Sequence, residues 1–396
     1  MRFLAVIVSL CASTCAIAAE RATVGPPSRQ QILECDKNHY ILDEPCRMRA
    51  TEVAIGYVGA VAVSPAGEVH FSSPHVVYRI DADGFLIRVA GTGRPGLSGD
   101  GGPAVEARLN FPQWYPEREN DPMDWSELLG PLAFDPDGNL YIGDAYNNRV
   151  RRIDTRGVIE TVDADTWLPQ GVAVGPDRNL YVSDGTGRLR RIAPDGKRTT
   201  LAGNNCGHHR APGLCAPQGI AVDPAGNAFV ADGYCRIRLV AADGSVRTFA
   251  GNDEPDGRGM AFTCGLTGDG PAATAALSWP SAVALDGLGN LVIADTYNHC
   301  IRRVDTAGML TTIAGRCINN RSPVRLGDGG PARDAQLEAP HGVAVDAAGN
   351  IYIADTANFR VRKIDVDGII TTIAGNGEPG CEMVTHAWGL PGCATP

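Results

Sequence analysis

The sequence of 396 residues has no apolar run long enough to cross a bilayer. Its first apolar run, Phe3 to Leu10, is far shorter than the about 18–20 residues that a spanning helix requires. Arg2 precedes this run, and small residues ending in Ala18-Ala19 follow it. This pattern is typical of a secretory signal peptide. We therefore expect residues 1–19 to be removed and the mature chain to be secreted or periplasmic, with no membrane span.

The sequence also lacks a favourable site for lipid attachment and an excess of positive charge. Cys11 and Cys15 lie in the signal segment, but Leu10 and Thr14 are poor residues immediately before a lipid-modified cysteine. Without Arg2, 34 basic residues stand against 45 acidic ones, which makes the formal net charge −11. Such a charge disfavours nucleic acid as a partner. We expect neither lipid anchoring nor nucleic-acid binding.

Cysteine, in contrast, is plentiful. Of twelve cysteines, ten remain after the signal peptide, and an even number suits disulfides in an oxidising compartment. The spacing predicts short loops closed by Cys35–Cys46 and Cys381–Cys393, and a Cys300–Cys317 bond that ties one repeat to its following loop. The pairing within the remaining group stays open; its members are Cys206, Cys215, Cys235 and Cys264.

Most of the chain is a repeat. Six segments share the pattern apolar-Ala-apolar-Asp, a spacer, Gly-Asn and a second apolar strand, and they begin at Gly59, Gly130, Gln170, Gln218, Ser281 and His341. Each continues into a basic strand, a turn and a fourth strand. Alternating apolar residues indicate half-buried strands, and the Gly-Asn and Asp-Gly pairs suit tight hairpins. Because one four-stranded unit cannot bury its own faces, the six units predict an all-β, six-bladed β-propeller of four-stranded antiparallel blades.

The repeat resembles the NHL repeat over residues 57–380. Forms such as Ala-Asp-Thr-x-Asn at 354–358 and Thr-Thr-Ile-Ala-Gly at 371–375 look like the subtype found in teneurin ectodomains and many bacterial secreted proteins. The first repeat departs from the pattern, since Ser64 and Ser73 replace its aspartates. The resemblance implies the fold but not the function, because such propellers include enzymes, receptors and scaffolds.

The chain thus divides into residues 1–19, a segment 20–56 with the Cys35–Cys46 loop, the propeller 57–380 and a Cys-bounded tail 381–396. We expect a monomer. Two ways to seal the ring stay open. Residues 51–55 could add a strand to the last blade, or the tail loop could pin a blade that is complete in itself.

Features that recur in the repeats are interpreted as architecture. Five repeats carry an aspartate that ends the second strand and an arginine in the third; these are Asp144, Asp184, Asp232, Asp295 and Asp355 with Arg151, Arg190, Arg238, Arg302 and Arg362. Three connections carry a Gly-Asp-Gly-(Gly)-Pro-Ala motif beginning at Gly99, Gly268 and Gly327. One carboxylate per motif is too few for a calcium cage, so we predict structural turns.

Unrepeated features are better guides to function. The first positions of the repeats, above all Gln170, Gln218, Ser281 and His341, form an uneven polar set that is expected at one mouth of the channel. The set suits either a ligand site or a solvated channel. The insertion 110–129 carries Trp114, Tyr115 and Trp125, which either pin the loop or bind a partner.

The fourth repeat is similar to a blade of peptidylglycine amidating lyase, a secreted propeller that uses zinc, a tyrosine and an arginine. The resemblance is carried by Cys215-Ala216-Pro217 and by Asp232-Gly233-Tyr234-Cys235. It implies a Cys215–Cys235 disulfide and a catalytic role for Tyr234. That family takes three zinc-binding histidines from first positions, whereas here His341 is the only histidine among them.

We therefore predict a non-enzymatic scaffold that binds a protein, peptide or glycan on a propeller face, without a required cofactor. The alternative is a lyase or hydrolase of amidating-lyase or lactonase type at the channel mouth, with Tyr234 and His341 as catalytic candidates and zinc or calcium as the metal.

Overall fold

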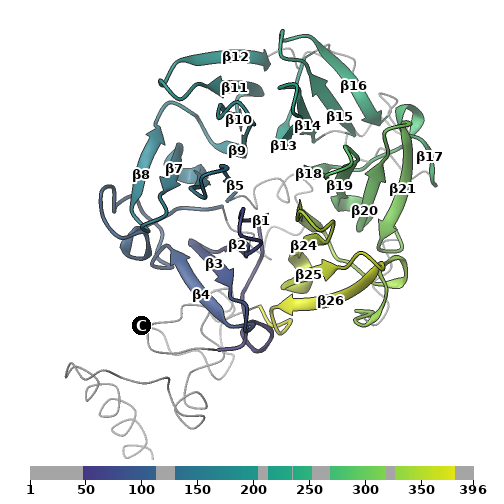
Figure 1. Cartoon of the computed structure of the whole chain (residues 1–396), viewed down its shortest axis with the longest axis horizontal. Coiled ribbons are helices and arrows are strands. Elements are labelled where there is room, and N and C mark those ends of the chain that lie inside the picture. The colour runs from purple at the N-terminus through teal and green to yellow at the C-terminus, as the bar shows by residue number, and fades with distance from the viewer. Residues whose placement is uncertain are drawn as a thin grey trace, which may run out of the picture.

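The computed structural model describes residues 48–112, 130–203, 213–233, 235–251, 268–317 and 326–379. Within these ranges the chain forms six antiparallel sheets arranged as blades around a central axis, as Figure 1 shows. These ranges contain no α-helix, only 3₁₀ turns. None of their helical segments is long and apolar enough to cross a membrane. The predicted all-β, six-bladed propeller is confirmed.

Each blade runs outward from the axis, in chain order. Blade 1 comprises β1 (Val61–Val63), β2 (Val69–Ser73), β3 (Val76–Ile80) and β4 (Leu86–Ala90). Blade 2 comprises β5 (Leu132–Phe134), β6 (Leu140–Asp144), β7 (Arg149–Ile153) and β8 (Ile159–Asp163). Blade 3 comprises β9 (Pro169–Val174), β10 (Leu180–Asp184), β11 (Arg188–Ile192) and β12 (Arg198–Gly203).

The other three blades follow the same order. Blade 4 comprises β13 (Pro217–Val222), β14 (Ala228–Asp232), β15 (Arg236–Val240) and β16 (Val246–Gly251). Blade 5 comprises β18 (Pro280–Leu285), β19 (Leu291–Asp295), β20 (Cys300–Val304) and β21 (Met309–Ala314), with β17 (Gly270–Pro271) added outside. Blade 6 comprises β23 (Pro340–Val345), β24 (Ile351–Asp355), β25 (Arg360–Ile364) and β26 (Ile369–Ala374), with β22 (Gly330–Pro331) outside.

The hairpin turns form as the Gly-Asn pattern predicts. In blade 6, one oxygen of the Asp346 carboxylate accepts the backbone N–H groups of Ala348 and Asn350, and the other accepts the Asn350 side-chain amide. Gly349 takes a φ of 89°, which a residue with a Cβ adopts only under strain. The local sequence therefore turns the chain before any contact between blades is needed.

The Gly-Asp-Gly motifs form what we call clasps: residues 99–109, 268–277 and 327–337. Each clasp contains a 3₁₀ turn; these are η3 (Ala104–Glu106), η7 (Ala272–Thr274) and η9 (Ala332–Asp334). A clasp joins two blades. The N–H of Gly315, after the outer strand of blade 5, donates to Ala332 O at 3.0 Å, while Pro331 pairs with Ile369 of blade 6. The clasps add β17 and β22, so two blades have five strands instead of four.

Residues 48–55 close the ring as a fourth clasp that lacks the motif. This segment contains η2 (Ala50–Glu52). Leu86 N–H of blade 1 donates to Met48 O, and Gly375 N–H of blade 6 donates to Ala50 O, both at 2.9 Å. The described strands of each blade are contiguous in sequence, so residues 51–55 add no strand to blade 6. The seam between the last and first blades is thus built like the others.

The Cys300–Cys317 disulfide that the sequence predicts is present. Cys235 also forms a disulfide, but not with Cys215. The predicted Cys215–Cys235 pair is therefore wrong; the Cys215 sulfur lies 3.7 Å from an Arg236 guanidinium nitrogen instead. The predicted pairs Cys35–Cys46 and Cys381–Cys393 lie outside the described residues, and so do Cys206 and Cys264, whose pairing the sequence leaves open.

Candidate functional site

The polar first positions lie where the inner strands of blades 3 to 6 begin. In each of these blades a proline pairs with the aspartate that ends the second strand, and the register then shifts; the prolines are Pro169, Pro217, Pro280 and Pro340. Gln170, Gln218, Ser281 and His341 immediately follow these prolines and fall at the shifts. A β-bulge of this kind redirects a side chain away from the regular pleat.

At two of these positions the backbone carbonyl accepts a hydrogen bond from a hydroxyl group of the preceding blade. Ser183 Oγ donates to Gln218 O at 2.6 Å, and Ser281 Oγ donates to His341 O at 2.8 Å. Across the closing seam, Thr356 Oγ1 donates to Val58 O at 2.8 Å. Adjacent inner strands are therefore locked together at the end where the candidate residues lie.

Two of the candidate side chains have acceptor atoms that the described protein does not use. Gln170 and Gln218 are 8% and 3% exposed, and the Oε1 atom of each accepts no hydrogen bond from any described residue. An unsatisfied buried carbonyl costs about 1–3 kcal/mol. Ser281 differs, because its hydroxyl is bonded to Thr296 Oγ1 and to His341 O. Both glutamines thus carry a buried acceptor that has no donor among the described residues.

Glycines occupy the same positions in blades 1 and 2. A Cβ at Gly130 would lie 2.9 Å from the ring of Phe111, which covers it. Gly59 is partly buried and adds no side chain. At this end of the channel, blades 3 to 6 therefore contribute polar side chains, whereas blades 1 and 2 contribute no side chain at the same positions.

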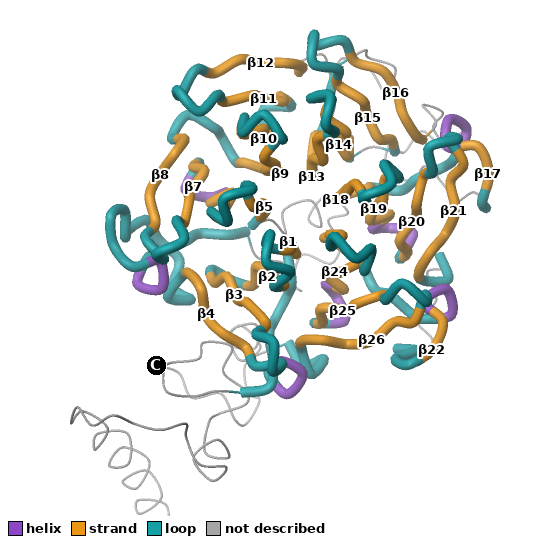
Figure 2. The backbone as a smooth tube through the Cα atoms, viewed as in Figure 1, coloured by secondary structure: helices purple, strands orange, loops and turns teal. Residues whose placement is uncertain are grey.

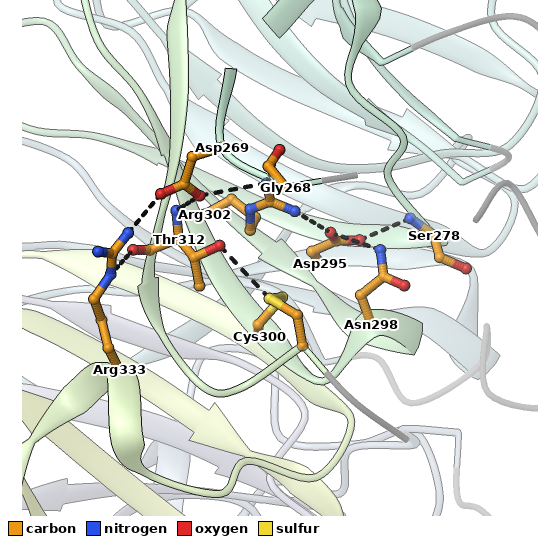
Figure 3. The surroundings of a disulfide bond; sticks show 10 residues. Gly268, Asp269, Ser278, Asp295, Asn298, Cys300, Arg302, Thr312 and Arg333 are labelled. Atoms are coloured by element: carbon orange, nitrogen blue, oxygen red, sulfur yellow. Dashed lines mark hydrogen bonds and ion pairs between the residues drawn. A yellow bond between two sulfur atoms is a disulfide. The ribbon is translucent and has the colours of Figure 1, made fainter. Parts of the chain in front are cut away.

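The repeated aspartates and arginines are used in internal bonds, as predicted. In blade 6 the buried Asp355 accepts Glu338 N–H at 2.8 Å and Arg362 Nη1 at 3.1 Å, and burial raises the pKa of Asp355. Figure 3 shows the equivalent set in blade 5, where Asp295 accepts Ser278 N–H and faces Arg302.

Blade 4 departs from the predicted pairs. Asp232 binds Arg236 at 3.0 Å, whereas Arg238 donates to Thr248 Oγ1 at 2.6 Å. In this blade the arginine that binds the buried aspartate therefore lies two residues before the predicted one on the third strand. The aspartate still binds the incoming chain, through the N–H groups of Cys215 and Ala216.

Comparison with known families identifies the repeat. A model of the NHL repeat matches residues 277–304, and a model of the teneurin NHL domain matches residues 314–382. The chain is an NHL-repeat β-propeller. This confirms the resemblance seen in the sequence.

The NHL-repeat propeller is similar to parts of much longer proteins. It is 28% identical to mouse Teneurin-3 over 314 residues, which are 70% of this chain and 9% of Teneurin-3. It is 36% identical to chicken NHL repeat-containing protein 2 over 115 residues, which are 28% of this chain and 15% of that protein. The chain spans about a tenth of the length of the teneurins that it matches.

Solved structures share the fold of the NHL-repeat propeller. One is a protein of unknown function from Bacteroides thetaiotaomicron, with a TM-score of 0.59 and 17% identity over 82% of this chain and 73% of that chain. Another is an auxiliary nutrient binding protein from Bacteroides ovatus, with a TM-score of 0.56 and 15% identity over 84% and 74% of the two chains. At these identities the likeness concerns the fold alone.

Several predicted site residues of the NHL-repeat propeller lie outside the described residues: Trp114, Tyr115, Trp125 and Tyr234. His341 is described and is 2% exposed. Among the described residues, no group of three or more His, Cys, Asp or Glu side chains is arranged to hold a metal ion.

Two exposed aromatic residues were missed by sequence reasoning. Trp167 is 53% exposed and lies against Gly185, and Tyr146 is also exposed. The N–H of Tyr146 donates to Asn110 O at 3.0 Å, so it lies where the aromatic insertion begins. Tyr146 has a counterpart in Tyr297 of blade 5, two residues after the equivalent aspartate, so it belongs to the repeat pattern. Trp167 is a single aromatic residue in a connection and has no periodic signal.

Proposed function

We propose that the NHL-repeat propeller is a secreted or periplasmic binding scaffold and not an enzyme. Its ligand docks at the channel end and donates hydrogen bonds to Gln170 and Gln218. The observation that carries this proposal is the pair of buried Oε1 atoms with no donor among the described residues. These side chains stand on bulges of the neighbouring strands β9 and β13, and the hydroxyl of Ser183 in blade 3 holds the backbone carbonyl of Gln218 in place.

The chemistry of this end favours a neutral, hydroxyl- or amide-rich ligand such as a glycan. The nearby carboxylates are already bonded within the protein: Asp184 pairs with Arg190 at 3.1 Å and Asp232 with Arg236 at 3.0 Å. The rim therefore offers hydrogen bonds and little net charge. In the proposal, the insertion adds Trp114, Tyr115 and Trp125 as aromatic contacts. Peptide and protein ligands are the alternatives that the experiment compares.

The test is calorimetric titration of the full mature chain with two sets of probes, neutral oligosaccharides and uncharged tetrapeptides. We expect saturable binding of an oligosaccharide, weakened at least about tenfold by the double change Gln170→Met and Gln218→Met, which keeps side-chain length but removes the acceptors. Thr371→Val, on the exposed outer strand of blade 6, is the matched control. Binding that the double change leaves intact would refute the site.

A second measurement separates the scaffold from an enzyme that uses a metal. The purified protein is analysed for zinc and calcium before and after His341→Ala. Stoichiometric metal that is lost with this substitution would overturn the non-enzymatic proposal. We expect no metal whose retention depends on His341.

A further inference from the structure

The outer edges of four blades are covered by clasps. In Figure 2 the purple turns of the clasps lie at the rim of the ring, beside the outer strands that they cover. In blade 2, Gly101 N–H donates to Ile159 O and Ile159 N–H donates to Gly102 O. In blade 6, Gly329 N–H donates to Ile370 O in the same way. A clasp is thus an extended segment added to the edge of a sheet.

Each of two clasps also delivers an aspartate to an arginine and a threonine. In blade 6, Asp328 accepts Arg362 Nη2 and Thr372 Oγ1, each at 2.8 Å. In blade 2, Asp100 accepts Arg151 Nη2 at 2.7 Å and Thr161 Oγ1 at 2.8 Å. The arginine and threonine are a cross-strand pair in both blades. The arginine–threonine pair and the sheet edge beside it therefore bind an extended segment that carries an aspartate.

Blade 3 has no clasp among the residues that the structure describes. The connection from β8 to β9 comprises residues 164–168, all of them described, and is too short to reach the edge of β12. No described residue pairs with that edge. Arg198, which corresponds to the fully buried Ile370, is exposed, and so are Thr199 and Thr200. The outer edge of blade 3 is therefore open among the described residues.

The arginine–threonine pair is nevertheless retained in blade 3. Arg190 and Thr200 form the same cross-strand pair that binds the clasp aspartate elsewhere. The Arg190 side chain is 15% exposed, whereas Arg151 and Arg362 are fully buried under their clasps. Arg190 keeps its ion pair with Asp184, and its Nη1 donates to Asp165 O at 2.9 Å.

The backbone of β12 also presents its hydrogen-bonding groups outward. Ala193 N–H donates to Lys197 O across the β11–β12 turn. Because hydrogen-bonded and non-bonded pairs alternate in an antiparallel ladder, Arg198 and Thr200 direct their N–H and C=O groups away from β11. Arg198 takes the position at which Ile159 and Ile370 bind their clasps. An extended segment can therefore add to β12 in the same register.

We propose that the edge of blade 3 binds an extended peptide segment of a partner protein, with an aspartate placed between Arg190 and Thr200 as Asp328 is between Arg362 and Thr372. The residues after the aspartate are small, because the clasps place Gly-Gly-Pro or Gly-Pro at the edge. This site is distinct from the channel end and does not depend on the ligand proposed there.

The charges of the edge agree with an acidic segment. Lys197 and Arg198 lie at the beginning of β12, where the clasped blades have aliphatic residues such as Ile369 and Ile370. Arg198 is already paired with Asp163 at 2.9 Å and with the more exposed Asp165 at 3.4 Å, so Lys197 is the residue that supplies positive charge to the segment. Basic residues at an open edge also prevent pairing between identical chains, so the edge favours an acidic partner over a second copy.

The probe is a fluorescein-labelled peptide with the sequence of residues 326–337, which is the clasp of blade 6. It is titrated into the full mature chain and followed by fluorescence anisotropy. The other clasps belong to the same chain as the edges that they cover, so each competes for its own edge at a high effective concentration. The free peptide is therefore expected to bind the edge of β12. We expect a Kd of about 100 μM, since the peptide loses its conformational freedom on binding. A peptide with Asp328→Asn is expected to bind at least about tenfold more weakly.

Variants of the protein test where the peptide binds. Thr200→Val is expected to weaken binding about fivefold, while Thr199→Val, next to it on the same strand, is the control without effect. Arg198→Pro removes an outward N–H and is expected to abolish binding, whereas Arg198→Ala keeps that N–H and is expected to cost at most about threefold. Circular dichroism checks that each variant is folded.

Three results would overturn the proposal. They are the absence of saturable binding at millimolar peptide, equal binding of the aspartate and asparagine peptides, and equal binding to the wild-type, Arg198→Pro and Thr200→Val proteins.

Discussion

Blade 6 and blade 3 have the same inner architecture and different outer edges. Both bury an aspartate at the end of the second strand and pair it with an arginine of the third. In blade 6 a clasp covers that arginine, whereas in blade 3 a connection of five residues leaves it partly exposed. The comparison shows that the repeat builds the blade, while the length of the preceding connection decides whether its edge is covered.

The largest effect that separates these blades is expected from their arginines. Arg362→Met leaves the buried Asp355 without its cation and should lower the free energy of unfolding by about 3–5 kcal/mol. Arg190→Met should cost only about 1–2 kcal/mol, because the Arg190 side chain is 15% exposed, whereas Arg362 is fully buried and also binds Asp328. Urea unfolding of both variants at pH 7 measures the difference. Equal losses would show that the clasp does not change the surroundings of the arginine.

The disulfide in blade 5 attaches the blade to the long connection that follows it. Arg302 in blade 5 lies 3.6 Å from Asp295 and 3.9 Å from Asp269, which is farther than in blade 6. Cys300 and Cys317, 17 residues apart, tie this blade to the connection that leads into the next clasp. Replacing both with alanine should cost about 3 kcal/mol in urea unfolding. A loss below about 1 kcal/mol would mean that hydrogen bonds alone suffice there.

The entries to blades 2 and 3 provide a pH test. His75 Nδ1 accepts Phe111 N–H at 3.1 Å, and Asn148 Oδ1 accepts Leu168 N–H at 2.8 Å in the same role. Burial lowers the pKa of His75 to about 4 from 6.5. The unfolded chain therefore takes up a proton that the folded chain does not, so stability present above pH 6.5 is lost as the pH falls toward 4.

His75→Asn should remove this dependence, because asparagine accepts the same bond and tolerates the left-handed backbone, φ 55°, at this position. Relative to the variant, the wild-type protein should lose about 2 kcal/mol between pH 6.5 and 4.5. Urea unfolding of both proteins at several pH values measures this difference. Burial raises the pKa of Asp295 to about 6, which gives a pH dependence of the opposite sign, but this contribution is the same in both proteins and cancels in the difference. Parallel curves for the two proteins would contradict the assignment.

The smallest effect concerns the clasp aspartate itself. Asp328→Asn keeps the shape of the side chain but weakens the bond to Arg362 Nη2, and it should cost about 1 kcal/mol at pH 7. The matched change in blade 2, Asp100→Asn, should cost about the same, since Asp100 accepts Arg151 Nη2 at 2.7 Å and Thr161 Oγ1 at 2.8 Å. Thermal unfolding of both variants measures the two costs. Clearly unequal costs would contradict the equivalence of the two clasps.

Local patterns predicted much of this molecule. Alternating residues and turn pairs such as Gly349-Asn350 act over a few positions, so the blades and their number follow from them. The Cys300–Cys317 bond was also predictable, because the two cysteines flank one strand pair. The Cys215–Cys235 pair was wrong because it was transferred from a resemblance, while the actual orientation of Cys215 depends on how the chain enters blade 4.

The amino-acid order alone was enough to specify a ring of NHL-repeat blades, since hairpin geometry and strand burial are encoded within each repeat. Contacts between distant residues decided the rest. Residues 48–55 act as a clasp without its motif, because their backbone groups hydrogen-bond to Leu86 of blade 1 and to Gly375 of blade 6. The buried acceptors of Gln170 and Gln218 and the open edge beside Thr200 arise in the same way. They depend on what the folded ring places next to each residue, and no local sequence contains that information.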